Sequence, residues 1–327
     1  MFTRSLAGAF AFALLTFTAA AQPADQYAVV HGWPVMPEGY ILGQATGVGV
    51  DSHNHVFVFH RAGRMWTEPF PDAFIAPATV AIFDGATGAH VGAWGSNQFV
   101  MPHGLSIDAA DNVWLTDVGS HQVFKFSHDG ALLLTLGAAR VPGDDVAHFN
   151  LPTDVAVRPD GGFFVSDGYA NTRVVSFAAD GTFLSQWGVP GSGAGEFDLP
   201  HGIAIDAAGR VYVADRSNAR VQVFDAGGRF HSQWQQKALG RPYAIAIGPD
   251  GKAYVVDGGD QPQALPDRSS AMRLSLDGRI EAAFGRYGNY DGQFMLGHDI
   301  AVGRDGVVYV VDAWGQRVQK FAKRSGS

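Results

Sequence analysis

The sequence contains no cysteine, so it has neither a disulfide framework nor a thiolate ligand or nucleophile. Basic residues are also scarce: 23 Lys and Arg stand against 31 Asp and Glu, for a formal net charge of −8. This balance argues against binding to a nucleic-acid backbone, which requires a basic face. No apolar run reaches the roughly 20 residues of a membrane-spanning helix. No helical periodicity is present either.

The first residues have the pattern of an export signal. Arg4 precedes an apolar run from about Leu6 to Phe17, and Ala19-Ala20-Ala21 follows. This order predicts a secretory signal peptide over residues 1–21, cleaved before Gln22. We therefore expect the mature chain, residues 22–327, to be exported to a periplasm or to the exterior as one domain without a membrane span.

Glycine is abundant, at 42 of 327 residues, and the chain repeats one unit six times. The first strand of the successive units reads GVGVD, GLSID, DVAVR, GIAID, AIAIG and DIAVG. A polar turn and a second strand follow, such as VWLTD, VYVAD or VYVVD, and most units add a third and a fourth strand. Alternating β-branched residues with frequent turns predict four-stranded antiparallel sheets. Six such sheets predict an all-β, six-bladed β-propeller.

The sixth unit lacks a fourth strand, because the chain ends soon after QRVQKF. The segment QYAVVHGWP, residues 26–34, resembles the missing strand, with Trp33 in the position of Trp187 and Trp234. We expect residues 26–34 to pair with the last blade, which would close the ring and remove an exposed sheet edge.

Histidine alternates around the predicted ring. The residue before the first strand of each unit is, in order, Thr46, His103, Thr153, His201, Tyr243 and His298. Alternate blades of six lie about 120° apart, and the first strand of each blade lines the central channel. The three imidazoles are therefore expected to meet on the axis. Three neutral imidazoles suit zinc and leave one coordination position open, which is typical of a catalytic zinc site.

A second position distinguishes two opposite blades. The second strand ends in Asp in five units, which indicates a structural, turn-capping role. Among the residues that follow the second strand, only those of units one and four are arginine, Arg61 and Arg216. Guanidinium groups bind carboxylates through paired hydrogen bonds, so these two arginines favour an anionic substrate. Surface ion pairs with nearby acids are the alternative interpretation. In unit three, Tyr169 follows a glycine at this position.

Several motifs together resemble one family of NHL-repeat propellers. They are FHRAGRMW (59–66), PHGLSID with WLTDVGSHQVFKF (102–126), FNLPTDVAV with VSDGYANTRVVSF (149–177), LPHGIAID with VADRSNARVQVF (199–224), and GHDIAV (297–302). In these motifs, which extend from about Gly47 to Phe321, the chain resembles the peptidyl-α-hydroxyglycine α-amidating lyases, also called peptidylamidoglycolate lyases.

The resemblance implies a reaction and a set of site residues. The reaction splits a C-terminal α-hydroxyglycine into an amide and glyoxylate. The implied zinc ligands are His103, His201 and His298. The implied active-site residues are Arg61, Tyr169 and Arg216, with Tyr169 as a hypothetical general base. A structural calcium ion is implied at the backbone carbonyls of Val48 and Leu105 and the carboxylate of Asp299, whose oxygen ligands suit calcium.

Two departures from the animal members of the family limit what carries over. Their disulfides are missing here, and Ala170 occupies the position of a cysteine that often follows the motif tyrosine. No hydroxylating monooxygenase is fused to this chain, so a separate partner enzyme or a different N-acyl hydroxyglycine substrate is implied. Two other functions stay open: a non-catalytic NHL propeller that binds a protein, peptide or glycan, and another metal-dependent propeller enzyme.

Overall fold

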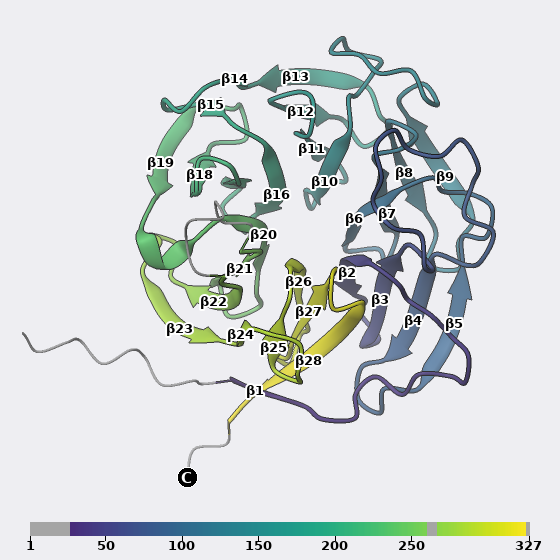
Figure 1. Ribbon diagram of the computed structural model, residues 1–327. Coiled ribbons are helices and arrows are strands. Elements are labelled where there is room, and N and C mark those ends of the chain that lie inside the picture. The colour runs from purple at the N-terminus through teal and green to yellow at the C-terminus, as the bar shows by residue number, and fades with distance from the viewer. Residues whose placement is uncertain (1–26, 260–266, 325–327) are drawn as a thin grey trace, which may run out of the picture.

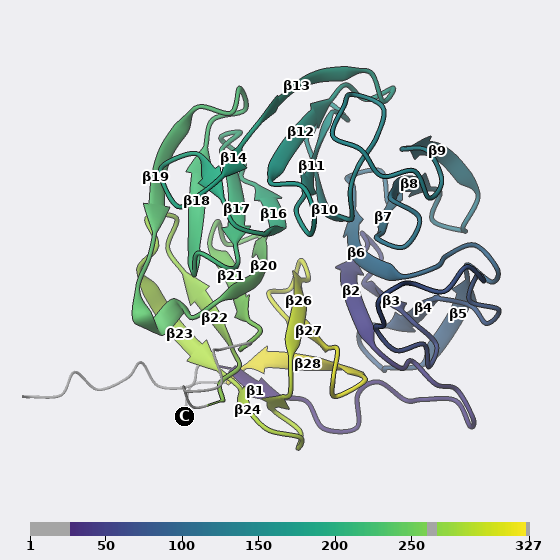
Figure 2. The ribbon, with the colours of Figure 1, turned by 45° about the horizontal axis from the view of Figure 1, so that its top comes forward.

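The computed structural model describes residues 27–259 and 267–324, and the predicted signal peptide lies outside this part of the chain. Six four-stranded antiparallel sheets are arranged radially around a central axis (Figures 1 and 2). The prediction of a six-bladed all-β propeller is thus confirmed. Among the described residues, no helix is long and apolar enough to cross a membrane.

Each blade is numbered here in chain order from its innermost strand. Blade one contains β2 (Ala45–Val50), β3 (His55–His60), β4 (Val80–Asp84) and β5 (His90–Trp94). Blade two contains β6 (Pro102–Ile107), β7 (Val113–Asp117), β8 (Gln122–Phe126) and β9 (Leu132–Leu136). Blade three contains β10 (Pro152–Val157), β11 (Phe163–Asp167), β12 (Arg173–Phe177) and β13 (Phe183–Trp187).

The second half of the ring repeats this order. Blade four contains β16 (Pro200–Ile205), β17 (Val211–Asp215), β18 (Arg220–Phe224) and β19 (Phe230–Trp234). Blade five contains β20 (Pro242–Ile247), β21 (Ala253–Asp257), β22 (Ser270–Leu274) and β23 (Ile280–Phe284). Blade six contains β26 (Gly297–Val302), β27 (Val308–Asp312), β28 (Arg317–Lys323) and the N-terminal β1 (Tyr27–Val29). Between the blades lie two parallel pairs, β14 (Val189–Pro190) with β15 (Glu196–Phe197) and β24 (Arg286–Tyr287) with β25 (Gln293–Phe294), and a 3-10 turn, η1 (Lys237–Leu239).

The N-terminal strand joins the two ends of the described chain. β1 pairs antiparallel with β28, with Val29 opposite Phe321, and the two strands lie side by side in Figure 1. Beyond β1, Trp33 packs on Gly88 in blade one in the same way as Trp94, Trp187 and Trp234 pack on Gly130, Gly228 and Gly278 of the blades that follow them. All four glycines have φ between 80° and 89°, and a Cβ there would come within 2.8 Å of the indole. At these four places, a Trp therefore fastens the outer edge of one blade to the next blade.

The hydrophobic core lies between neighbouring blades and not on the axis. One cluster combines Phe57 and Phe59 of blade one with Leu105 and Leu115 of blade two. Another combines Val58 of blade one with residues of blade six. Because neighbouring blades cover both faces of a sheet, the second strands β7, β17 and β27 are buried along their whole length.

We predict that Tyr27→Ala destabilises the ring closure by about 3–5 kcal/mol, the range for removing a buried aromatic side chain. The Tyr27 ring is 2% exposed, lies 4.6 Å from that of Phe284, and shares a 3.0 Å hydrogen bond with the Tyr254 hydroxyl. Urea unfolding followed by tryptophan fluorescence measures the effect. Tyr290→Ala is the control, because that side chain is 80% exposed and should change stability little. Equal stability of the two variants would contradict a closing role for β1.

Candidate active site

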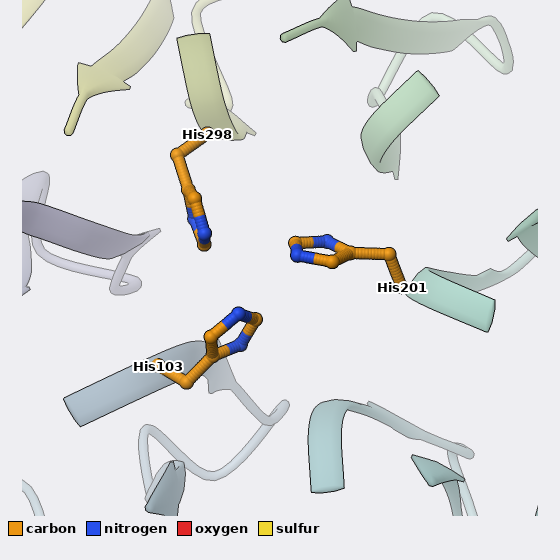
Figure 3. A group of neighbouring side chains, drawn as sticks. All are labelled: His103, His201 and His298. Carbon is orange, nitrogen blue, oxygen red and sulfur yellow. The ribbon is translucent and has the colours of Figure 1, made fainter. Parts of the chain in front are cut away.

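The three alternating histidines converge on the axis. His103, His201 and His298 lie near the start of the inner strands β6, β16 and β26, and their rings point toward one another (Figure 3). The ring centroids are 4.7, 4.7 and 5.0 Å apart, and one nitrogen from each ring lies within 4.8 Å of the others. All three side chains are buried. The buried triad could therefore hold a metal ion.

Each histidine is oriented by the blade that follows it. The Nδ1 atoms of His103, His201 and His298 lie 2.7, 2.6 and 2.7 Å from the backbone carbonyl oxygens of Thr153, Tyr243 and Thr46, respectively. A carbonyl oxygen only accepts hydrogen bonds, so each Nδ1 carries the proton. The Nε2 lone pair is then free to bind a metal, and the hydrogen bond fixes the plane of the ring.

The imidazoles are neutral at physiological pH. Burial lowers the pKa of His103 and His201 far below the usual value for histidine, and the charges of the neighbouring histidines add to the effect. Burial also lowers the pKa of His298 to about 3, with a contribution from Arg61. Only a neutral imidazole can be a ligand, so the environment favours the metal-binding form.

Aspartates at the ends of the second strands hold the backbone that leads into each histidine. Each carboxylate accepts a hydrogen bond from a backbone N–H two or three residues before the histidine of its own blade. The pairs are Asp117 with Met101, Asp215 with Asp198, and Asp312 with Leu296, at 2.8, 2.8 and 2.9 Å. The structural role expected for these aspartates thus includes positioning of the triad as well as capping of the turns.

Tyr169 lies beside the triad. Its hydroxyl is 3.1 Å from His103 Nε2 and 3.2 Å from His201 Nε2. Because the Nδ1 atoms carry the imidazole protons, both Nε2 atoms are acceptors, and the phenol donates toward them. The hydroxyl is therefore close to any ion or substrate atom held by these nitrogens. The Trp66 ring lies 5.3 Å from the Tyr169 ring and covers one side of it.

The two arginines lie near Tyr169, as the position of their blades predicts. Arg61 is buried, and its Nε donates to the Pro102 carbonyl at 3.1 Å while Nη1 donates to Gln44 Oε1 at 2.5 Å. Burial lowers the pKa of Arg61 to about 10, although Tyr169 acts in the opposite direction. Arg61 is thus cationic at neutral pH and buried by the site.

Arg216 approaches from the opposite side of the ring. Its guanidinium carbon lies 4.0 Å from the centroid of the Tyr243 ring and 6.0 Å from that of Tyr169. The charge of Arg216 contributes to the lowered pKa values of all three histidines, which places it in electrostatic contact with the triad. Arg61 is buried and Arg216 is half-buried.

The residues of the implied calcium site also lie together. Val48, Leu105 and Asp299 line a central cavity of about 210 Å³. Asp299 Oδ2 accepts a 2.8 Å hydrogen bond from the Val48 N–H of the adjacent blade. Asp154 lines the same cavity, and its Oδ2 accepts a 3.1 Å bond from the Ile203 N–H. Burial raises the pKa of both carboxyls, and the charge of Asp154 raises that of Asp299 further. Two acids that disfavour each other's ionisation in this way suit a cation between them.

The donor set of the triad fits a borderline-soft divalent ion. Zinc–nitrogen bonds are about 2.0–2.1 Å, which places ligands roughly 3.3 Å apart, within the 4.8 Å that the three nitrogens span. The Nε2 lone pairs are unprotonated and the rings are oriented, and the Tyr169 hydroxyl lies beside two of the nitrogens. Small movements of the rings would complete the coordination.

Sequence reasoning missed several residues of this site. Asp154 was missed, although it occupies the position of Asp299 directly across the ring, and a comparison of the residues that follow the histidine position would have paired the two. Tyr243 contacts Arg216 from the histidine position of blade five, whereas nothing in the repeat marks Gln44 and Trp66, which contact Arg61. Their contacts depend on loops and on a neighbouring blade, which the spacing of the repeats does not reveal.

Comparison with known proteins agrees with the fold. The NHL repeat family matches residues 99–126 and 197–224. The fold is similar to that of a streptogramin B lyase, with a TM-score of 0.59 and 15% identity over 91% of this chain and 98% of that one. That likeness defines the class as an NHL-repeat β-propeller.

Closer relatives define the family. The chain is 35% identical over 304 residues to peptidyl-alpha-hydroxyglycine alpha-amidating lyase 2 of Drosophila melanogaster, covering 87% of this chain and 71% of that protein. It is 38% identical over 304 residues to peptidyl-glycine alpha-amidating monooxygenase B of Xenopus laevis, covering 86% of this chain but only 34% of that protein. This chain belongs to the peptidyl-α-hydroxyglycine α-amidating lyase family, and it spans about a third of the frog monooxygenase.

The depressed pKa of His298 predicts a pH-dependent stability in metal-free protein. Below pH 6.5 the unfolded chain binds a proton at this histidine while the folded chain does not, so the free energy of unfolding falls as pH drops. Between pH 7 and pH 5 this group accounts for about 2 kcal/mol of that loss. His298→Gln should therefore show a loss smaller by that amount in urea unfolding of chelator-treated protein. His31→Gln, at an exposed site, should retain the full loss; identical pH dependence in both variants would contradict the assignment.

Proposed function

We propose that this protein is a zinc-dependent lyase that cleaves the C–N bond of a peptidyl- or N-acyl-α-hydroxyglycine to give an amide and glyoxylate. The arrangement that supports this most is the Tyr169 hydroxyl within 3.2 Å of two nitrogens of a buried three-histidine cluster, between two arginines. Family membership supplies the reaction, and the site contains a group for each of its requirements.

The reaction moves one proton. The substrate hydroxyl loses its proton as the carbon–oxygen double bond of glyoxylate forms, the C–N bond breaks, and the amide nitrogen gains a proton. Tyr169 is the proposed base for the hydroxyl proton, because its oxygen lies close to any substrate oxygen held at the triad. A phenol ordinarily ionises near pH 10, and the positive charges of Arg61 and Arg216 favour the phenolate.

Arg61 and Arg216 are the proposed binding groups for the substrate carboxylate. They come from opposite blades, and both lie near Tyr169. A cation buried beside the reacting atoms also stabilises negative charge that develops in the transition state, and it does so without reorganisation because it is already in place. Gln44 and Pro102 hold Arg61 in this orientation.

His103, His201 and His298 would hold the zinc ion, which supplies Lewis-acid polarisation of a substrate oxygen when bound. A structural calcium ion is proposed at Asp299 and the carbonyls of Val48 and Leu105. Asp154 faces the same cavity and would add negative charge. A cation there would relieve the repulsion between the two carboxylates, which links blades on opposite sides of the ring.

The hydroxyglycine substrate must be supplied by a hydroxylation reaction. A monooxygenase that hydroxylates the α-carbon of a C-terminal glycine is the class of enzyme that the proposed reaction requires.

Tyr169→Phe should lower turnover by about 10²- to 10⁴-fold, the usual contribution of a general base, while zinc content stays at the parent level. Glyoxylate release from α-hydroxyhippurate, together with metal analysis of the purified protein, measures both quantities. Tyr290→Phe, at an exposed site, is the matched control.

His201→Ala in the same assay should lose zinc and glyoxylate release together. Glyoxylate formation that survives this substitution would contradict the proposed zinc mechanism. Equal loss of zinc and activity in Tyr169→Phe would make that tyrosine structural. Stoichiometric zinc without lyase activity on any hydroxyglycine would favour a non-catalytic binding propeller.

We also propose that the chain is exported after removal of residues 1–21. Expression of the full chain in a bacterial host should yield a processed protein outside the cytoplasm whose N-terminal sequence begins at Gln22. Arg4→Glu, which reverses the charge that precedes the apolar run, should retain the precursor in the cell. An unprocessed precursor from the parent chain would contradict the export proposal.

A further inference from the structure

A second group of side chains that could hold a metal ion lies at the end of the blades opposite the histidine triad. His103 and its equivalents are near the start of the inner strands, whereas Asp51 follows the end of β2. His55 begins β3 beyond the same turn, and His128 is in the turn between β8 and β9 of blade two. The group therefore joins two neighbouring blades on the opposite face of the propeller.

The three ligand atoms already surround one point. Asp51 Oδ2 lies 2.9 Å from His55 Nδ1 and 2.9 Å from His128 Nε2, and all three atoms lie within 4.8 Å of one another. In a tetrahedral zinc site with bonds of about 2.0–2.2 Å, neighbouring ligand atoms are roughly 3.3 Å apart. Replacement of the two hydrogen bonds by a metal ion therefore requires the side chains to separate by only about 0.4 Å.

The group is fixed in position and open to solvent. Asp51 Oδ1 accepts hydrogen bonds from the backbone N–H groups of His53 and His55, at 2.9 and 2.7 Å, which leaves Oδ2 directed toward the imidazoles. His128 Nδ1 lies 3.1 Å from Asp129 Oδ1, the carboxylate–histidine pairing typical of metal ligands. The Asp51 side chain is fully buried, while those of His55 and His128 are 32% and 35% exposed, so an ion can enter.

Further polar side chains lie next to the group. A third imidazole is adjacent: His53 Nδ1 lies 3.9 Å from Asp51 Oδ2 and 3.6 Å from Asp111 Oδ2. These groups could supply a further ligand or a hydrogen-bonding outer shell.

The other blades show what this position does without a metal. Asp108 in blade two and Asp206 in blade four are equivalent to Asp51 and cap the same turn. Their Oδ2 atoms bind Asn112, Trp114 and Lys125 in blade two and Arg210 and Tyr212 in blade four. Zinc does not ordinarily take those side chains as ligands. Turn capping explains the aspartate in the three blades that carry it, but it does not require the imidazoles, which surround it only in blade one.

We propose that Asp51, His55 and His128 form a second site for a divalent transition-metal ion of the zinc type, which joins blades one and two. The site is independent of the proposed lyase activity, because its ligands lie on the face opposite Tyr169 and the triad. The ion would have at least one position open to solvent or to His53.

Zinc binding to the full-length protein, stripped with a chelator and dialysed against buffered free zinc, tests the proposal. His128→Gln should hold one zinc ion per chain fewer than the parent protein. Zinc should also raise the Tm of this variant by less than it raises the Tm of the parent. His55→Gln should give the same result. His148→Gln is the matched control, because His148 pairs with Asp145 at 2.8 Å in a lone histidine–carboxylate contact and should retain the parent's zinc content.

Zinc content equal to the parent's in both His55→Gln and His128→Gln would overturn the proposal and leave the group as a hydrogen-bonded turn cap. The proposal of this second metal site and the proposal of lyase activity can be contradicted independently of each other. His201→Ala should keep the zinc ion that His128→Gln loses, and His128→Gln should release glyoxylate at the parent rate. A parent protein that binds this ion but releases no glyoxylate would contradict the lyase proposal alone.

Discussion

The hydrogen bond from one blade's histidine to the next blade's backbone is the interaction on which the axial site depends. In each case Nδ1 donates to the carbonyl of Thr153, Tyr243 or Thr46, the residue that occupies the histidine position in the following blade. One contact thus joins neighbouring blades, sets the tautomer and directs Nε2 to the axis. Each imidazole thus uses the main chain of the blade that lies between it and the next histidine.

The same alternation explains how a buried polar centre is tolerated in the middle of the ring. The three imidazoles are neutral because burial and two nearby arginines disfavour their protonation. Below them, two aspartates on opposite blades raise each other's cost of ionisation. Each of these features would destabilise an apolar core, and each is relieved by a bound cation. The axis is therefore arranged for ligands, while stability comes from the apolar clusters between blades.

Because one unit is repeated around the ring, a blade that departs from the repeat can be recognised by comparison with the others. The turn-capping aspartate after the first strand has partners such as Asn112 or Arg210 in most blades that carry it, but imidazoles in blade one. The second strands end in aspartates that hold the approach to each histidine, and the residues that follow them differ where substrate chemistry is expected. A departure from the repeat is informative because the remaining copies show what the fold alone requires.

Much of this protein was determined by its sequence. Six copies of one strand pattern dictate the propeller, and the periodic placement of His103, His201 and His298 dictates their convergence, because equivalent positions in a closed ring must be equidistant from its axis. The repeat positions and the resemblance of the motifs to one lyase family predict Arg61, Tyr169 and Arg216 as site residues.

Only the tertiary structure decided which partners those residues have. The cover that Trp66 places on Tyr169 and the meeting of Asp51 and His55 with His128 join segments whose separation follows no repeat. Side-chain contacts between blades depend on rotamers and on loop paths, and neither is encoded in the spacing of strands.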